Sequence, residues 1–287
     1  MTVLYHYCST SAFLSIVGSR SIWLSSLSLS NDSLEGKLVA EIVARISASE
    51  GLDQAYLENL QDGVTFIEQL FDGLGFCLSE EGDLLSQWRG YASDATGFSL
   101  GFSKKYIESL SEALRKQDPS GFSMHKVEYQ TVAQEELVRP TYQKVKQIID
   151  DGGLKIPRPR GLLDTRSDEE IEKEIEKFKE AHKSMYKMML GLLPKLYTLK
   201  TPAFREEREW RLISYLMKDA NATCSYRALD NRIVPIRKID LIKIENDPIS
   251  EVIIGPKNLT PNYVIEKFLK QHGFENVVVK RSSATYR

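Results

Sequence analysis

The chain has 287 residues, of which 42% are hydrophobic and 27% are charged, and its formal net charge is -2. This length and composition are those of an ordinary globular protein that can bury a core without disulfides or metals. The near-neutral charge excludes a strongly basic protein that binds nucleic acids non-specifically, although a local basic patch remains compatible with it.

Cysteine usage and the N-terminal sequence bear on the cellular compartment. The three cysteines, Cys8, Cys77 and Cys224, are far apart and odd in number, which argues against a disulfide framework and against a structural zinc site. The N-terminus lacks a basic segment followed by an apolar one, and no apolar stretch approaches the length of a membrane span. We therefore expect a cytoplasmic protein that has no membrane partner.

The first half of the chain shows short β-branched and aromatic segments interspersed with segments of helical spacing. We expect strands at residues 3–7, 21–25, 75–79, 97–102 and 125–129. We expect helices at residues 9–17, 34–46, 57–70, 83–91 and 104–116.

The second half begins with a predicted helical block. A helix over Gln134–Ile149 is followed by a loop at Asp151–Thr165, which is rich in Gly and Pro. Dense i,i+4 charge pairs over Ser167–Gly191 predict a long helix with a solvated first half. The expected elements after this block are strands at 210–215, 223–228, 232–237, 241–245, 250–255 and 276–280, and a helix at 261–271.

Strands and helices do not alternate in strict βαβ order along the chain. This pattern favours an α+β fold with a mixed, mainly antiparallel sheet. We expect a single domain over residues 1–287, in which residues 134–197 form a helical insertion or side lobe.

A histidine ends the first predicted strand, in the segment Tyr5–Ser9. Such a side chain can bind a ribose or an amide edge, with His6 forming one hydrogen bond and the backbone supplying others. A hydrogen bond from His6 to a neighbouring carbonyl is the equally weighted alternative.

Polar residues gather where a predicted loop meets a helix, at Asn31, Asp32 and Glu35. Asp32 followed three residues later by Glu35 matches a capping box, and capping alone explains this pattern. Metal binding by Asp32, Glu35 and Glu209, with Lys200 nearby, is an alternative that would suit a metal-dependent nuclease.

Ser79 ends a predicted strand and is followed by a short helix that carries two aromatic residues. Trp88 and Tyr91 are three residues apart, so they share one face of that helix. They could stack on a planar ligand or pack against the sheet, and packing is the favoured interpretation for Trp88.

Two carboxylates, Glu207 and Glu209, precede the apolar strand at 210–215. In an extended chain, residues two apart point to the same face. Carboxylates held close together raise the pKa of one of them, which suits general acid–base work or the stabilisation of a cationic transition state. Arg208 and Arg211 can offset the repulsion, and a solvated charged run is the alternative.

Several of these motifs occur in one recognisable order. The motifs are Leu4–Ser9, Ile22–Ser25, Asn31-Asp32 with Glu35, Cys77–Ser79 with Trp88 and Tyr91, Gly97–Phe102, Lys200, Phe204, Glu207, Glu209–Leu212, Ile254–Pro256 and Tyr286-Arg287. This order resembles the bacterial domain-of-unknown-function family DUF2971 over nearly the whole chain. Cys8 stands where the pattern has Thr, and the charged helix 167–191 fits the pattern poorly.

The order of a strand-end His, a Ser after a central strand and a late Glu-x-Glu is also similar to the ADP-ribosyltransferase fold. That resemblance implies a split sheet and NAD as the substrate. It implies that Glu209 is the catalytic carboxylate, that Glu207 orients the acceptor, and that His6 contributes to the reaction. The NAD-binding residues that it implies are His6, Tyr7, Ser9, Asn31, Ser79, Trp88 and Tyr91.

The sequence therefore leads to three functional hypotheses. The first is an ADP-ribosyltransferase or NAD glycohydrolase, such as a toxin or a phage-defence effector, that acts on a protein or nucleic-acid acceptor. The second is the metal-dependent nuclease described above. The third is a non-catalytic sensor or interaction module that binds a partner protein through the helix 167–191.

Overall fold

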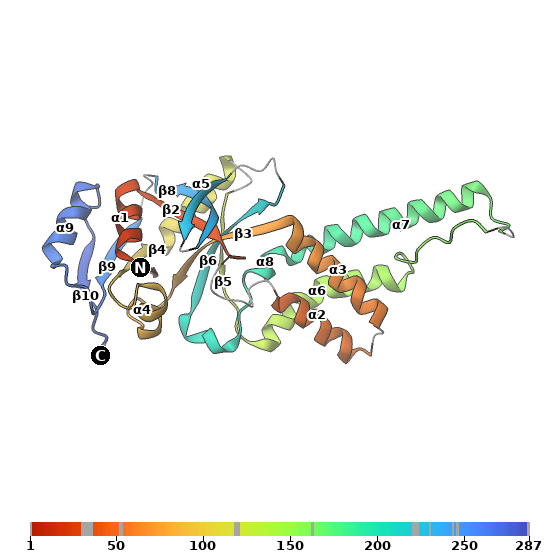
Figure 1. Cartoon of the computed structure of the whole chain (residues 1–287), viewed down its shortest axis with the longest axis horizontal. Helices are drawn as coiled ribbons and strands as arrows, with labels where there is room; N and C mark the ends of the chain where they lie inside the picture. Colours follow the sequence, from red (N-terminus) through yellow and green to blue (C-terminus); the bar gives the residue numbers. More distant parts are fainter. Residues whose placement is uncertain are drawn as a thin grey trace. The chain divides into compact units, whose positions relative to one another are not determined.

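The computed structural model of the chain describes residues 2–29, 37–51, 54–117, 121–161, 164–219, 224–229, 231–242, 244 and 247–285. Its contacts divide the chain into two compact units (Figure 1). Unit 1 comprises residues 1–31, 72–127 and 201–287, and unit 2 comprises residues 32–71 and 128–200. The side lobe predicted at 134–197 falls within unit 2, which also takes in residues 32–71.

Unit 1 is built on a ten-stranded sheet of described residues. Its strands are β1 (Val3–Cys8), β2 (Ser21–Ser26), β3 (Phe71–Ser79), β4 (Phe98–Ser103), β5 (Ser123–Lys126), β6 (Glu209–Met217), β7 (Ser225–Leu229), β8 (Arg232–Asp240), β9 (Ile249–Ile254) and β10 (Val278–Arg281). The strand order is β10-β9-β4-β1-β3-β2-β8-β7, with β6 paired to β3 and β5 paired to β6. The β9–β10 pair is parallel, whereas β1 pairs antiparallel with β3 and β4, and β2 with β3 and β8. The predicted α+β fold with a mixed, mainly antiparallel sheet is confirmed.

Strand β3 lies at the centre of this sheet and pairs with β1 and β2 through different stretches. Tyr5 of β1 lies opposite Ser79, whereas Ser25 of β2 lies opposite Gly75. A Cβ atom on Gly75 would lie 2.6 Å from the side chain of Leu27, so this close approach requires glycine. These pairings place the end of β3 beside the middle of β1.

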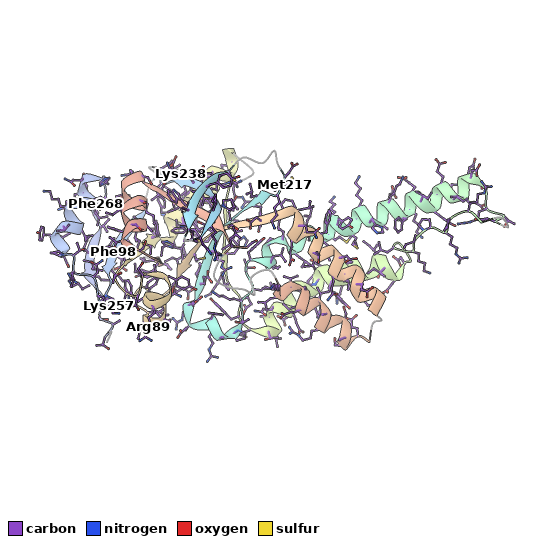
Figure 2. The ribbon with its side chains drawn as sticks, in the orientation of Figure 1. Arg89, Phe98, Met217, Lys238, Lys257 and Phe268 are labelled. Carbon is purple, nitrogen blue, oxygen red and sulfur yellow. The ribbon has the colours of Figure 1, made fainter. Side chains whose placement is uncertain are left out.

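The two faces of the sheet are covered by different helices. Helices α1 (Thr10–Ser19), α5 (Lys104–Gln117) and α9 (Asn262–Gln271) contribute to the main hydrophobic core on one face. Within that core, Phe13 stacks on Phe98 with ring centroids 4.2 Å apart and lies 5.8 Å from Phe268. Figure 2 labels Phe98 and Phe268 at this place.

Helix α4 (Leu85–Tyr91) packs on β1 through a second, smaller apolar cluster. Tyr7, Trp88 and Ile253 belong to this cluster. Because Leu4 and Cys8 belong to the main core while Tyr7 belongs to the small cluster, the side chains of β1 alternate between the two faces.

Unit 2 is helical. It contains α2 (Leu38–Ser49), α3 (Gln54–Leu70), α6 (Thr131–Asp150), α7 (Asp168–Met189), the 3-10 helix η1 (Leu190–Leu192) and α8 (Leu193–Leu196). Helix α7 begins with a capping box, in which Ser167 and Glu170 bond to each other's backbone amides. The long helix predicted at 167–191 is therefore confirmed. No helix among the described residues is both long and apolar enough to cross a membrane.

Two local predictions at strand boundaries were wrong. Strand β3 contains the predicted residues 75–79 but starts earlier, at Phe71, and within it the buried Asp72 accepts a hydrogen bond from the Ser28 hydroxyl at 2.8 Å. The described part of the strand predicted at 241–245 is not a strand. The amide of Leu241 instead donates to the Arg20 carbonyl after β8 has ended.

Candidate functional site

The two carboxylates singled out in the sequence lie where a 3-10 helix meets a strand. The 3-10 helix η2 (Pro202–Glu207) ends at Glu207, and β6 starts at Glu209. Between them Arg208 has a left-handed backbone, with φ of 42°. The prediction that both carboxylates lie on one extended chain was therefore wrong. Both side chains are nonetheless buried, with 7% and 6% of their surface exposed.

Glu209 is anchored by an arginine two residues further along the strand. The Arg211 Nε lies 2.7 Å from the Glu209 Oε1, and a terminal nitrogen lies 3.0 Å from Oε2. This bidentate geometry is the strongest that an arginine and a carboxylate can form. Arg211 is only 2% exposed, so this ion pair lies away from water.

Glu207 is held by Ser79 and Tyr91. The Ser79 hydroxyl donates to the Glu207 carbonyl at 2.7 Å and accepts from the Glu81 amide at 3.0 Å. The Tyr91 hydroxyl donates to the Glu207 Oε1 at 3.1 Å. We refer to Ser79, Tyr91, Glu207, Glu209 and Arg211 as the Glu207 cluster.

Tyr7 contributes to the loop that carries helix α4. Its hydroxyl donates to the Glu81 carbonyl and accepts from the Leu84 amide, each at 2.8 Å. Burial raises the pKa of the Tyr7 hydroxyl, so the hydroxyl keeps its proton. Because these bonds hold the start of α4, Tyr7 positions Tyr91 and is not itself directed at a ligand.

Trp88 is fully buried and is therefore packed, as the favoured interpretation of the sequence had it. Its ring edge lies against Tyr7, with centroids 4.9 Å apart, and its Nε1 donates to the Asp83 Oδ1 at 2.7 Å. Tyr91, one turn further along α4, is 47% exposed. Of the two aromatic candidates, only Tyr91 offers a ring to a ligand.

His6 does not join the Glu207 cluster. Tyr5 and Ser79 lie directly opposite each other and share one face, so His6, the next residue, points to the other face. There its ring stacks on Phe76 with centroids 3.9 Å apart, and its Nδ1 donates to the Cys77 carbonyl at 2.8 Å. The structure therefore matches the alternative interpretation of the sequence, in which His6 bonds to a neighbouring carbonyl. His6 and Ser79 lie on opposite faces of the sheet.

The remaining NAD-binding candidates are Ser9 and Asn31. Ser9 is the N-cap of α1, where its hydroxyl accepts from the Ala12 amide at 3.2 Å. Asn31 lies outside the described residues, as do Asp32 and Glu35. Within the part of the chain that the structure describes, no group of three metal-ligating side chains is found.

Glu80 lies beside the site, although the sequence did not lead us to predict it as a site residue. Glu80 accepts hydrogen bonds from Lys126 at 2.7 Å and from the Trp210 indole at 2.8 Å, and its amide donates to the Arg208 carbonyl at 3.2 Å. These bonds tie the end of β3 to the start of β6. In the sequence, the position of Glu80 directly after Ser79 could have indicated that it belongs near the site.

We expect His6 to make stability depend on pH. Burial lowers its pKa from 6.5 to about 4. Above pH 6.5 the side chain is neutral in both states, so it has no effect there. As the pH falls from 6.5 to 4, the unfolded state takes up a proton that the folded state does not, and up to about 3 kcal/mol of stability is lost. Urea unfolding at pH 7 and pH 4.5 measures this loss.

The control for this prediction is His6→Gln, which keeps a donor for the Cys77 carbonyl but does not titrate. The loss of stability between pH 7 and pH 4.5 should be smaller in the variant than in the wild type. Equal pH profiles for the two proteins would show that His6 titrates normally in the folded state.

A comparison with protein-family models found a match in the middle part of the chain. Residues 87–212 match the model of a family described as "Protein of unknown function (DUF2971)". Searches of curated proteins and of solved structures found no match. The matched span is less than half of the chain and includes Tyr91, Glu207 and Glu209, but neither His6 nor Ser79. The match agrees with the resemblance to DUF2971 over residues 87–212 and does not extend to the motifs outside that span.

Proposed function

We propose that the chain is an NAD-consuming enzyme, an ADP-ribosyltransferase or NAD glycohydrolase, and that the Glu207 cluster is its site. The observation that carries this proposal is the buried Glu207 held by Ser79 and Tyr91, with the buried Glu209 two residues further along the chain, where β3 ends and β6 begins. Buried carboxylates with fixed partners are typical of functional sites. A protein or nucleic-acid acceptor, and a role as a toxin or phage-defence effector, belong to the same proposal.

The chemistry of NAD cleavage suits this arrangement. Nicotinamide leaves with the electron pair of its bond to the ribose, which builds positive charge on the ribose ring. Glu209, whose orientation is fixed by Arg211, stabilises that charge and the ribose hydroxyls. The nucleophile, which is water or an acceptor group, attacks the same carbon and gives its proton to Glu207.

The neighbours of the two carboxylates take distinct roles. The exposed ring of Tyr91 offers a surface on which a flat nicotinamide or adenine ring can stack. The hydroxyl of Ser79 is used by the Glu207 carbonyl and the Glu81 amide, so Ser79 is a positioning residue. His6 has no part in this version of the site, in contrast to the ribose-binding role that the resemblance implied.

The test is NAD turnover by the purified full chain, measured as nicotinamide release and as transfer of labelled ADP-ribose. Glu209→Gln should lower nicotinamide release by about a hundredfold, because a neutral amide stabilises a developing cation far less than a carboxylate does. Glu207→Gln should lower transfer to an acceptor more than it lowers nicotinamide release.

The matched control is Glu206→Gln, which removes the exposed neighbouring carboxylate of η2 and should leave turnover unchanged. Each variant is compared with the wild type by circular dichroism, so that a folding defect is recognised. The proposal fails if the wild type neither binds NAD, nor releases nicotinamide, nor labels any macromolecule. It also fails if a folded Glu209→Gln variant retains the wild-type rate.

A further inference from the structure

Unit 2 contains a pocket of about 830 Å³ between α7 and the loop that follows α6. Figure 1 shows this loop running beside the N-terminal part of α7. The pocket has the size of a site for a small organic ligand. Its lining comes from eight of the loop residues between Gly152 and Gly161, from Asp164 and Arg166, and from Glu174, Lys177 and Phe178 of the helix.

Two of the lining residues, Gly152 and Gly153, set the path of the loop directly after α6. Gly152 has φ of 72°, a conformation that favours glycine. A Cβ atom on Gly153 would lie 2.8 Å from the Cβ of Ala181 and 2.9 Å from the Ile148 carbonyl. The loop therefore turns tightly against α6 and α7 at this point.

Arg166 links the loop that lines the pocket to helix α7. Its Nε donates to the Asp164 Oδ1 at 2.9 Å, and its terminal nitrogens donate to the Glu174 Oε2 at 2.6 Å and to the Arg158 carbonyl at 3.1 Å. The hydrogen bonds from Arg166 hold the pKa of Asp164 well below its usual range. Both lining carboxylates are thus engaged by one guanidinium, and the loop is joined to α7.

The other lining cations are exposed and have no carboxylate partner among the described residues. They are Lys155, Arg158 and Lys177. With Arg166 they give the lining four positive side chains against two carboxylates, both of which are bonded to Arg166. The pocket therefore presents three cations to a ligand that carries several negative charges.

Apolar groups stand beside these cations. Pro157, Pro159 and the partly buried ring of Phe178 line the same pocket. Prolines have no amide hydrogen, so this part of the loop is poorly suited to pair with the backbone of an acidic peptide. An aromatic ring next to cations suits a flat base that is linked to phosphates.

We propose that this pocket binds a nucleoside polyphosphate, with its phosphates on Lys155, Arg158 and Lys177 and its base against Phe178. The site lies within unit 2, whereas the Glu207 cluster lies within unit 1. The inference therefore does not rest on the proposed NAD chemistry, and the ligand would act as an effector of the protein.

The experiment is calorimetric titration of the full chain with ATP, with inorganic triphosphate and with a hexaglutamate peptide. ATP should bind with one-to-one stoichiometry, inorganic triphosphate should bind more weakly, and the peptide should bind least. Lys177→Ala and Arg158→Ala should each weaken ATP binding about fivefold, the effect of one unit charge at about 4 Å in water. Raising the salt concentration should weaken it further.

The matched control is Lys179→Ala. Lys179 is exposed on the same helix, two residues from Lys177, but it does not line the pocket, so ATP affinity should stay at the wild-type value. Absence of ATP binding would overturn the proposal, as would equal losses in Lys177→Ala and Lys179→Ala. Equal affinity for ATP and inorganic triphosphate would show that the base makes no favourable contact with Phe178. Tighter binding of the hexaglutamate peptide would show that the pocket prefers an acidic peptide to a nucleoside polyphosphate. Glu209→Gln should bind ATP normally, which separates this test from that of NAD turnover.

Discussion

Arg211→Ala is expected to lower the free energy of unfolding by about 3–5 kcal/mol. The substitution removes the hydrogen bonds from the Arg211 Nε and a terminal nitrogen to the buried Glu209 carboxylate, together with the positive charge of the guanidinium. A buried carboxylate that loses a cationic partner lowers stability, because water cannot solvate it as it does at the surface. Urea-induced unfolding followed by circular dichroism measures the effect.

A double variant separates the charge from the packing. In Glu209→Gln with Arg211→Met, both charges are absent and most of the volume is kept, so the loss of stability should be clearly smaller than in Arg211→Ala. Arg205→Ala is the surface control, because Arg205 is exposed, and it should change stability by less than about 0.5 kcal/mol. If Arg211→Ala were as stable as this control, the buried ion pair would be irrelevant to the fold.

Trp88→Ala is the second substitution with a large expected effect, about 3–5 kcal/mol of stability. Trp88 has no exposed surface and is among the largest fully buried side chains. Its removal leaves a cavity between α4 and β1 and takes one of the donors away from Asp83. Denaturant unfolding of the full chain gives the value.

Two further variants locate the source of this loss. Trp88→Phe keeps an aromatic ring in the cluster but removes the indole donor, so it should cost less than Trp88→Ala. Asp83 keeps the hydrogen bonds that it accepts from Ser282 and Ser283 in that variant. Tyr91→Ala, on the same helix, removes a half-exposed ring and one hydrogen bond to Glu207, so it should cost about 1–2 kcal/mol. Equal losses for Trp88→Ala and Tyr91→Ala would contradict the packing argument.

The parts of the fold that local patterns control were predictable from the sequence. The charge pairs and capping residues of α7 lie within one segment, so its extent could be predicted to within a few residues. The strand at Asp72 could not, because a charged residue inside a strand needs a partner, and that partner, Ser28, is 44 residues away. The end of β8 likewise depends on a distant segment, because Asp240 lies opposite Ser21, where the partner strand β2 begins.

The candidate site was predictable in composition but not in geometry. Ser79, Tyr91 and Glu207 do come together, as the order of motifs implied. The face on which His6 lies depends on the pairing of Tyr5 with Ser79, and no local pattern sets that register. Arg208 adopts a left-handed backbone without being glycine or asparagine, so the break between the two carboxylates had no sequence signal.

The division of the chain into two units also determines which unit is synthesised completely first. Both segments of unit 2 precede residue 201, whereas β6 to β10 of unit 1 all follow it. The helical unit is therefore complete while the central strand β3 still lacks its partner β6. During synthesis the helical unit can therefore fold before β3 is paired with β6. A fragment that ends at residue 200 retains all of the helical unit but only β1 to β5 of the described strands.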